Sequence, residues 1–287
     1  MRPLVITLSF LVFSMTLAAQ DDLLASLEEE QADETTWIEA TFKGTRVING
    51  HSIETRKKGV MDFMISHRFG TIDGGTYELF GLDQASIRIG LEYAVTDRLY
   101  FGLGRSSFEK TYDGFVKYRL LRQSTGSKTM PLSVTWLSAA AIRTLKSPDQ
   151  DLSFQDKLAN TNQLLIARKF GNGISLQLMP SWVHRNLIQE GELNNDIFAL
   201  GVGGRIKLSQ RVALCGEYYY QFQQLNEGTT NAIAIGFDIE TGGHVFQLQF
   251  TNATAMVPKG FITETTNDFF DGEIHFGFNI SRTFQVN

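Results

Sequence analysis

Several features that define common protein classes are scarce or absent in this 287-residue sequence. It contains one cysteine, Cys215, so an internal disulfide is excluded. No stretch after the N-terminal region reaches the roughly 18 to 20 apolar residues that a transmembrane helix requires. The formal net charge is −5, which gives no indication of nucleic-acid binding. Disulfide frameworks, helical membrane spans and a nucleic-acid partner are therefore not expected.

What is present begins with an export signal. Met1–Pro3 is a short positive start, Leu4–Leu17 is an apolar run of signal-peptide length, and Leu17–Ala19 offers small residues for cleavage. No cysteine follows that site, so a lipoprotein anchor is not expected. We predict a signal peptide over residues 1–19 and a periplasmic, secreted or outer-membrane destination for the mature chain.

A period-two alternation of apolar and polar residues recurs about twelve times between Gly59 and Phe284. In residues 86–93, for example, Ile87, Ile89 and Leu91 are apolar while the residues between them are small or charged. Such strands turn one face to lipid and the other to a polar interior. The candidate strands are Val60–Gly70, Ala85–Val95, Leu99–Arg105, Tyr112–Leu121, Leu132–Ile142, Gln163–Phe170, Ile174–His184, Ile197–Lys207, Val212–Phe222, Ala232–Ile239, His244–Thr251 and Ile274–Phe284.

The connections between these strands alternate in length. Short links rich in turn residues, such as 171–173 and 209–210, alternate with longer ones such as 144–161 and 252–270. Bacterial single-chain barrels combine short periplasmic turns with long external loops in this order. We predict an all-β fold, a transmembrane antiparallel up-and-down β-barrel of about twelve strands over residues 59–287, with an N-terminal periplasmic segment at residues 20–58.

Several short motifs lie at the joints of this pattern. They are Thr41–Arg46 before the first strand, His67–Gly70 at its end, Phe80–Asp83 before the second strand, and Gly104-Arg105 at the end of the third. Together they resemble an uncharacterised domain-of-unknown-function family of predicted outer-membrane β-barrel proteins from Gram-negative bacteria. The resemblance covers nearly the whole mature chain. It implies the fold and the outer-membrane location, and it implies no activity or catalytic residues.

The barrel lumen is the place where charged side chains are expected to gather. The alternation assigns to it a mixed set of charges: Asp62, Arg68, Arg88, Glu92, Lys117, Arg119, Lys169, Arg205, Lys207, Glu217, Asp238 and Glu273. One interpretation is a selectivity region for small solutes, anionic ones included, because charged rings determine which ions pass. The other is a structural network, because buried charges must pair to offset their desolvation. The two interpretations are compatible.

The segment before the first strand is not an ordinary linker. From Trp37 to Lys43 its residues alternate as in a strand, but adding it to the wall would make the strand number odd, which is unusual. Its cations, with Lys43 and Arg46 as the predicted plug residues, can meet acidic lumen groups such as Asp62, Glu217 or Glu273. We hypothesise that part of it folds into the periplasmic mouth; the alternative is a disordered tether.

No motif for catalysis or metal binding accompanies the barrel pattern. The sequence has no Gly-x-Ser-x-Gly, His-Glu-x-x-His or Cys-x-x-Cys pattern. His275, with Glu273 and Asn279 on one strand face, is the most suggestive set. The sequence predicts no enzymatic activity and no cofactor. It favours an outer-membrane channel or small-solute uptake protein, with membrane lipid and a small solute as partners. A structural or accessory subunit and, less favoured, an outer-membrane hydrolase are the alternatives.

Overall fold

The computed structural model describes residues 34–146, 152–187, 194–223, 226 and 228–286. The predicted signal peptide, residues 1–19, lies outside this part of the chain. The described residues belong to two units. The smaller unit comprises residues 34–38 and 122–131, in which β1 (Thr36–Trp37) pairs antiparallel with β6 (Ser124–Thr125). The larger unit comprises the remaining described residues and contains a barrel.

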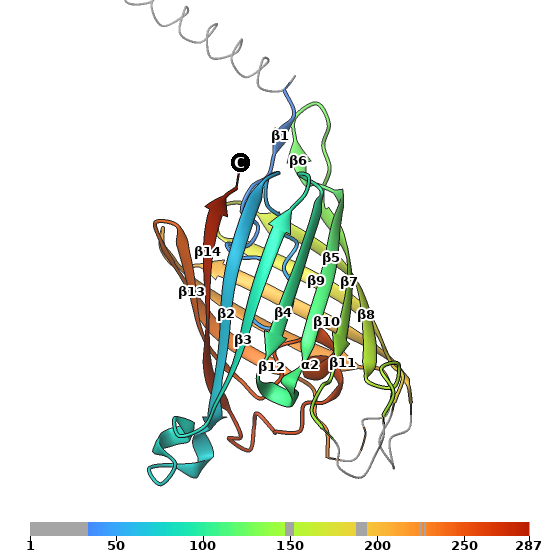
Figure 1. The fold of residues 1–287 in the computed structure, drawn as a ribbon. Helices are drawn as coiled ribbons and strands as arrows, with labels where there is room; N and C mark the ends of the chain where they lie inside the picture. Colours follow the sequence, from blue (N-terminus) through green and yellow to red (C-terminus); the bar gives the residue numbers. More distant parts are fainter. Residues whose placement is uncertain (1–33, 147–151, 188–193, 224–225, 227, 287) are drawn as a thin grey trace, which may run out of the picture. The chain divides into compact units, whose positions relative to one another are not determined.

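Twelve strands of the larger unit form a closed antiparallel barrel in the described part of the chain (Figure 1). Each strand pairs with its neighbours along the chain, and β14 pairs with β2 to close the wall. The predicted fold class and strand number are thus confirmed. The strands are β2 (Val60–Thr71), β3 (Ala85–Ala94), β4 (Leu99–Ser106), β5 (Tyr112–Leu121), β7 (Ser133–Ile142), β8 (Leu158–Phe170), β9 (Ile174–Arg185), β10 (Asp196–Lys207), β11 (Val212–Gln221), β12 (Ile233–Thr241), β13 (His244–Thr251) and β14 (His275–Gln285).

Most strand ends agree with the sequence pattern to within one or two residues, and β8 is the main exception. It begins at Leu158 rather than at Gln163, because residues 158–162 continue the pairing with β7. Asn160 and Asn162 are half-buried, and they alternate with the buried Ala159 and Thr161. Polar residues on the outer face hide the apolar alternation there, so the sequence pattern starts too late.

The outer face of the barrel is an apolar surface. Leu178 and Ile235 are 46% and 45% exposed, whereas their chain neighbours Gln177 and Ala234 are buried. Alternate residues of a strand point to opposite faces, so the apolar set covers the outside and the polar or small set lines the inside. Exposed aromatic side chains on this outer surface include Tyr112, Trp182 and Tyr220.

The two ends of the barrel differ. One end, here called the turn end, carries short connections such as residues 171–173 and 242–243. The other, the loop end, carries the longer ones, with the short helices η1 (Ile72–Gly74), η2 (Leu79–Gly81), η3 (Phe108–Lys110) and α2 (Pro258–Thr263). No helix within the described residues combines the length and apolar character needed to cross a membrane.

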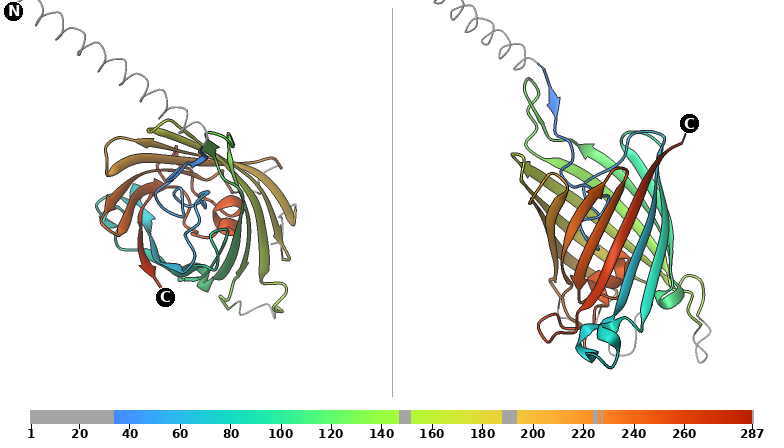
Figure 2. Two further views of the ribbon diagram at one scale, coloured as in Figure 1. Left: turned by 90° about the horizontal axis from the view of Figure 1, so that it is seen from above. Right: turned by 90° about the vertical axis from the view of Figure 1, so that its left-hand side faces the viewer.

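The interior of the barrel is occupied by the chain itself. Residues 39–58, here called the inner segment, run inside the ring of strands, where they are drawn in blue in Figure 2. Phe42, Val47 and Ile53 of this segment belong to a buried apolar cluster that also contains Leu137 of β7 and Phe261 of α2. This cluster explains why β7 is apolar on both faces: its inner face packs against protein rather than water.

Candidate functional site

The inner segment turns back on itself at Ile48 and Asn49. The Val47 amide donates to the Gly50 carbonyl at 2.8 Å, and the Ser52 amide donates to the Thr45 carbonyl at 3.0 Å. Asn49 and Gly50 are residue types that are common in turns. The turn leaves the amides at its tip without partners inside the segment.

Glu217 of β11 accepts hydrogen bonds from these tip amides. Its carboxylate lies 3.2 Å from the Ile48 nitrogen, 2.7 Å from the Asn49 nitrogen and 3.1 Å from the Gly50 nitrogen. Successive backbone amides that converge in this way form a concave anion site, and hydrogen bonds to a charged acceptor are stronger than neutral ones. The contact therefore fixes the tip of the inner segment to the wall.

Glu217→Gln is expected to loosen the tip. The amide side chain would present a donor to at least one backbone N–H, so a charge-assisted hydrogen bond worth about 1.5–3 kcal/mol is lost. Hydrogen exchange at the Ile48–Gly50 amides should accelerate accordingly. The matched control is Glu240→Gln, whose partially exposed ion pair with Lys43 is worth about 1 kcal/mol or less. Unchanged exchange in the Glu217 variant would show that this carboxylate does not hold the tip.

Carbonyl groups of the inner segment are bound by wall side chains as well. The Lys117 ammonium donates to the carbonyls of Thr45, Ser52 and Glu54 at 3.0–3.2 Å. Neutral amides do the same elsewhere: Gln247 binds the Val47 carbonyl, Asn279 the Ile48 carbonyl, and Gln177 the His51 carbonyl. A buried backbone without regular secondary structure needs such partners, because an unpaired buried polar group is costly.

A second acidic cluster, Asp62 and Glu92, binds one cation from each arm of the inner segment. Arg46 pairs with Glu92 at 2.7 Å, and Arg56 pairs with Asp62 at 2.7 Å. The Tyr100 hydroxyl lies between the two carboxylates, 2.7 Å from Asp62 and 2.8 Å from Glu92. These ion pairs are buried or nearly so, and removal of one partner would leave an uncompensated charge. The cluster ties both arms of the segment to β2, β3 and β4.

The other charges assigned to the lumen fall into three groups. Some bind the inner segment: Arg68 donates to the Asn49 side chain, Arg119 to the Thr55 carbonyl, and Lys169 to the Glu39 carbonyl. Others pair within the wall: Arg88 binds Asp113 and Arg205 lies 3.9 Å from Asp238. The third group lies apart from the interior. Lys207 is exposed near the turn end, and Glu273 precedes β14.

Glu273 differs most from the sequence pattern. Because β14 begins at His275, the Glu273 side chain belongs to the β13–β14 connection, where it accepts from the Asp268 amide at 2.7 Å. His275 likewise anchors this connection: one ring nitrogen lies 2.8 Å from the Phe69 carbonyl and the other 2.7 Å from the Asn267 side chain. Of the set that looked most suggestive of catalysis, Glu273 and His275 hold this loop in place, whereas Asn279 binds the inner segment.

Sequence reasoning missed most of the neutral side chains that bind the inner segment. Thr135 and Gln247 bind it from buried faces of their strands, as their place in the alternation would have indicated. Tyr100, which binds the wall carboxylates Asp62 and Glu92, was missed as well. Asp113, the partner of Arg88, was also missed. Gly104 of β4 lies beneath the Arg88 guanidinium, where a Cβ atom would collide with it. That steric requirement accounts for the glycine in the Gly104-Arg105 motif.

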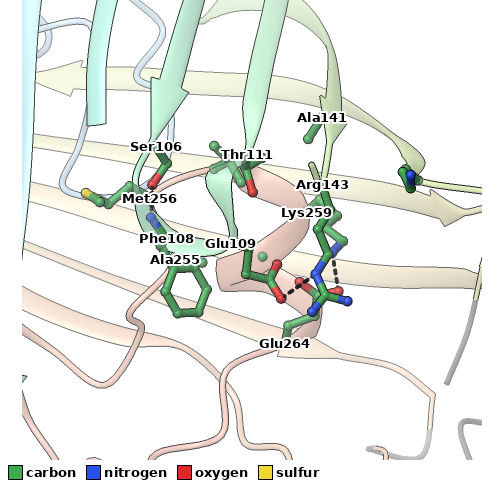
Figure 3. Close-up of a pocket in the computed structure, with 13 residues that line it drawn as sticks. Ser106, Phe108, Glu109, Thr111, Ala141, Arg143, Ala255, Met256, Lys259 and Glu264 are labelled. Carbon is green, nitrogen blue, oxygen red and sulfur yellow. Dashed lines mark hydrogen bonds and ion pairs between the residues drawn. The ribbon is translucent and has the colours of Figure 1, made fainter. Parts of the chain in front are cut away.

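A cavity of about 560 Å³ opens at the loop end. Its lining comes from η3, from the chain before β8, from the ends of β7 and β9, and from α2 with the residues after it. Figure 3 shows a smaller pocket beside it, in which Glu109 and Arg143 point toward each other near Lys259 and Glu264. Within the described residues, no group of three or more His, Cys, Asp or Glu side chains could hold a metal ion.

A family model described as "Membrane bound beta barrel domain (DUF5777)" matches residues 42–284. No curated protein matches the sequence. Among solved structures, the NanC porin is 6% identical, with 79% of this chain and 100% of that chain covered and a TM-score of 0.49. The KdgM porin is 8% identical, with 78% of this chain and 99% of that chain covered and a TM-score of 0.45. The outer membrane protein Omp33 of Acinetobacter baumannii is 8% identical, with 78% of this chain and 97% of that chain covered and a TM-score of 0.41. Since the family model spans most of the sequence, the chain belongs to the membrane-bound beta barrel domain family DUF5777.

Proposed function

We propose that the protein is a narrow outer-membrane channel for small solutes that the inner segment holds closed. The observation that carries the proposal is that the wall closes through the β14–β2 pairing without any contribution from residues 39–58. The inner segment is held by side-chain hydrogen bonds, ion pairs and apolar packing. It can therefore leave the lumen while the strand pairing of the wall stays intact.

The outer membrane is the proposed location. The export signal expected at residues 1–19 and the apolar outer face of a closed β-barrel support it, because barrels of this kind are built into that membrane. In this orientation the turn end faces the periplasm and the loop end faces outward. The inner segment then enters from the periplasmic side, and the loop-end cavity is the outer entrance.

One observation favours a second candidate, a barrel without transport that serves as a structural or accessory subunit. Leu165, Met179 and Leu137 on the wall pack with Val47 and Ile53 of the inner segment. Burial of such side chains stabilises the filled state by about 1.5–3 kcal/mol each. A barrel filled in this way could stay filled permanently, so the two candidates differ in whether the inner segment ever leaves.

Tethering the tip of the inner segment to the wall tests the channel. Ile48 lies in one buried cluster with the natural Cys215 of β11, so Ile48→Cys should allow a disulfide between them. In planar bilayers, the oxidised protein should lose the openings that the reduced protein shows, and reduction should restore them. The control carries Cys215→Ser in addition and should not respond to oxidant. Openings that persist in the fully cross-linked protein would contradict closure by this segment.

A further inference from the structure

The loop-end cavity brings together charged groups from separate parts of the chain. Arg143 follows β7, Lys157 precedes β8, Arg185 ends β9, and Lys259 lies on α2. These four cations share the cavity with Glu109, Asp156 and Glu264. Residues that converge from several elements on one cavity of this size are the usual arrangement of a small-molecule site.

Some of the charges that line the cavity pair with one another. Arg143 lies 3.0 Å from Glu109, and Lys259 pairs with Glu264. Arg185 lies 3.8 Å from the same Glu264. Within the described residues, the half-buried Lys157 ammonium forms no ion pair or hydrogen bond, while Asp156, whose charge it also feels, is hydrogen-bonded to Ser153. Among the described residues that line the cavity, four cations thus face three carboxylates.

The backbone at the rim of the cavity is held in an unusual conformation. Glu109 and Lys110 have φ angles of 52° and 51°, values that non-glycine residues seldom adopt. The Thr144 hydroxyl donates to the Lys110 carbonyl at 2.5 Å, and the Leu145 amide donates to the Glu109 carbonyl at 3.1 Å. Such conformations persist only where the surroundings enforce them, and they concentrate at functional sites. Here the conformation places Glu109 against Arg143.

We infer that this cavity is a binding site for a small organic anion that carries a carboxylate group. Arginine and lysine bind carboxylates through charge-assisted hydrogen bonds, and the guanidinium of Arg143 can bind one through two nitrogens. A volume of about 560 Å³ lies in the range typical of sites for small molecules. Lys157 and Arg143 are the residues expected to contact the anion.

Glu264 lies beside two of the cavity cations, Lys259 and Arg185. Burial raises the pKa of the Glu264 carboxyl, although the neighbouring Lys259 ammonium opposes this shift. The inference rests on the proposed function in one respect, namely that the bound anion is a solute to be admitted. Binding itself can be measured separately from transport.

A matched series of four-carbon probes tests the site. Succinate carries two negative charges, 1,4-butanediol none and putrescine two positive charges, while their chain lengths are equal. Titration calorimetry on the full-length protein in detergent should show saturable binding of succinate. The diol and the diamine should show none. Equal heats for all three probes would overturn the inference.

Variants then assign the binding to the cavity. Lys157→Gln and Arg143→Gln should each weaken succinate binding about tenfold or more, the equivalent of one charge-assisted hydrogen bond. Lys157 is partly exposed on a loop, so this variant should fold even if the Arg143 variant does not. The control is Arg211→Gln in an exposed turn at the other end of the barrel, which should bind as the natural protein does. Succinate affinity that is unchanged in both cavity variants would overturn the inference.

Conductance separates failure of this inference from failure of the proposed function. If succinate binds and the cavity variants weaken it, but no variant of the protein conducts, the anion site stands and the channel does not. If the protein conducts but succinate neither binds nor reduces the current, the channel stands and the anion site is overturned. If succinate reduces the current and Lys157→Gln relieves this block, both the channel and the anion site are supported.

Discussion

Deletion of residues 20–52 is expected to turn a mostly silent barrel into one that conducts continuously. The deletion removes the tip that Glu217 binds, the Arg46–Glu92 ion pair and the apolar contacts of Val47. The wall keeps all twelve strands that the described residues supply, because none of them begins before Val60. Single-channel recordings in planar bilayers should show long openings that the natural protein lacks.

The matched control removes residues 20–33 only and keeps every described contact of the inner segment, so it should stay closed. Gly50→Ala offers a milder variant of the same experiment. A Cβ atom at this position would collide with the Tyr219 hydroxyl, and Glu217 lies close by, so the tip must move away from β11. Silence of both the deletion and this variant, with heat-modifiable barrels on gels, would favour the second candidate, a barrel without transport.

The sequence predicts the wall of this barrel well because each strand carries its own evidence. Lipid on one side and protein on the other impose period two on every strand, so twelve independent segments report the same architecture. The alternation weakens where the inner face of a strand is not polar or its outer face is not apolar. β7 faces a packed apolar cluster instead of water, and the first residues of β8 carry asparagines on the outer face.

The inner segment is harder to predict because it follows no period. Within the strand-like stretch 37–43, only Trp37 lies in a strand. It and the preceding Thr36 pair with Ser124 and Thr125. Beyond them, the position of each residue depends on partners far away in sequence. The Glu217 carboxylate, for example, binds amides about 170 residues earlier in the chain. Local sequence contains no signal for such pairing.

The charged residues in the sequence identified only some of the side chains that bind the inner segment. Asp62 and Glu217 were suggested as acidic partners of the segment, and both bind it. Glu217 does so through backbone amides rather than through a cation, and Arg46 pairs with Glu92 instead. Side-chain charges can be counted in a sequence, whereas the orientation of backbone donors depends on the turn that the chain adopts. The turn had to be known before this contact could be found.

The lumen faces of the wall are less tolerant of substitution than an open, water-filled barrel would be. Gln177 is buried, and its side chain accepts from the Ile53 amide at 2.6 Å while it donates to the His51 carbonyl at 2.7 Å. Ala234 lies in the cluster with Ile48. Arginine at either position would therefore displace the inner segment. A test of the two faces must use positions on the outside.

Arginine placed along the outer face of β9 is expected to destabilise the barrel in a depth-dependent manner. Ile174 and Leu178 are both 46% exposed on this face, and Ile174 is the first residue of the strand. Leu178 lies four residues further on, about 13 Å along the strand. A charge near the bilayer midplane has neither water nor a counter-ion, whereas one near the interface can reach the headgroups. Leu178→Arg should therefore cost about 2–4 kcal/mol of folding free energy, and Ile174→Arg about 0–1 kcal/mol.

Reversible unfolding by denaturant in lipid vesicles measures both losses. Leu178→Ala separates the loss of apolar area from the effect of the charge, because it shortens the side chain without adding one. If the two arginine variants lose the same small amount, this face of β9 does not contact the hydrocarbon, and the membrane placement of the wall is wrong. A large loss at Ile174 as well as at Leu178 would instead place the turn end of β9 within the hydrocarbon, because only a charge that cannot reach the headgroups carries the full cost.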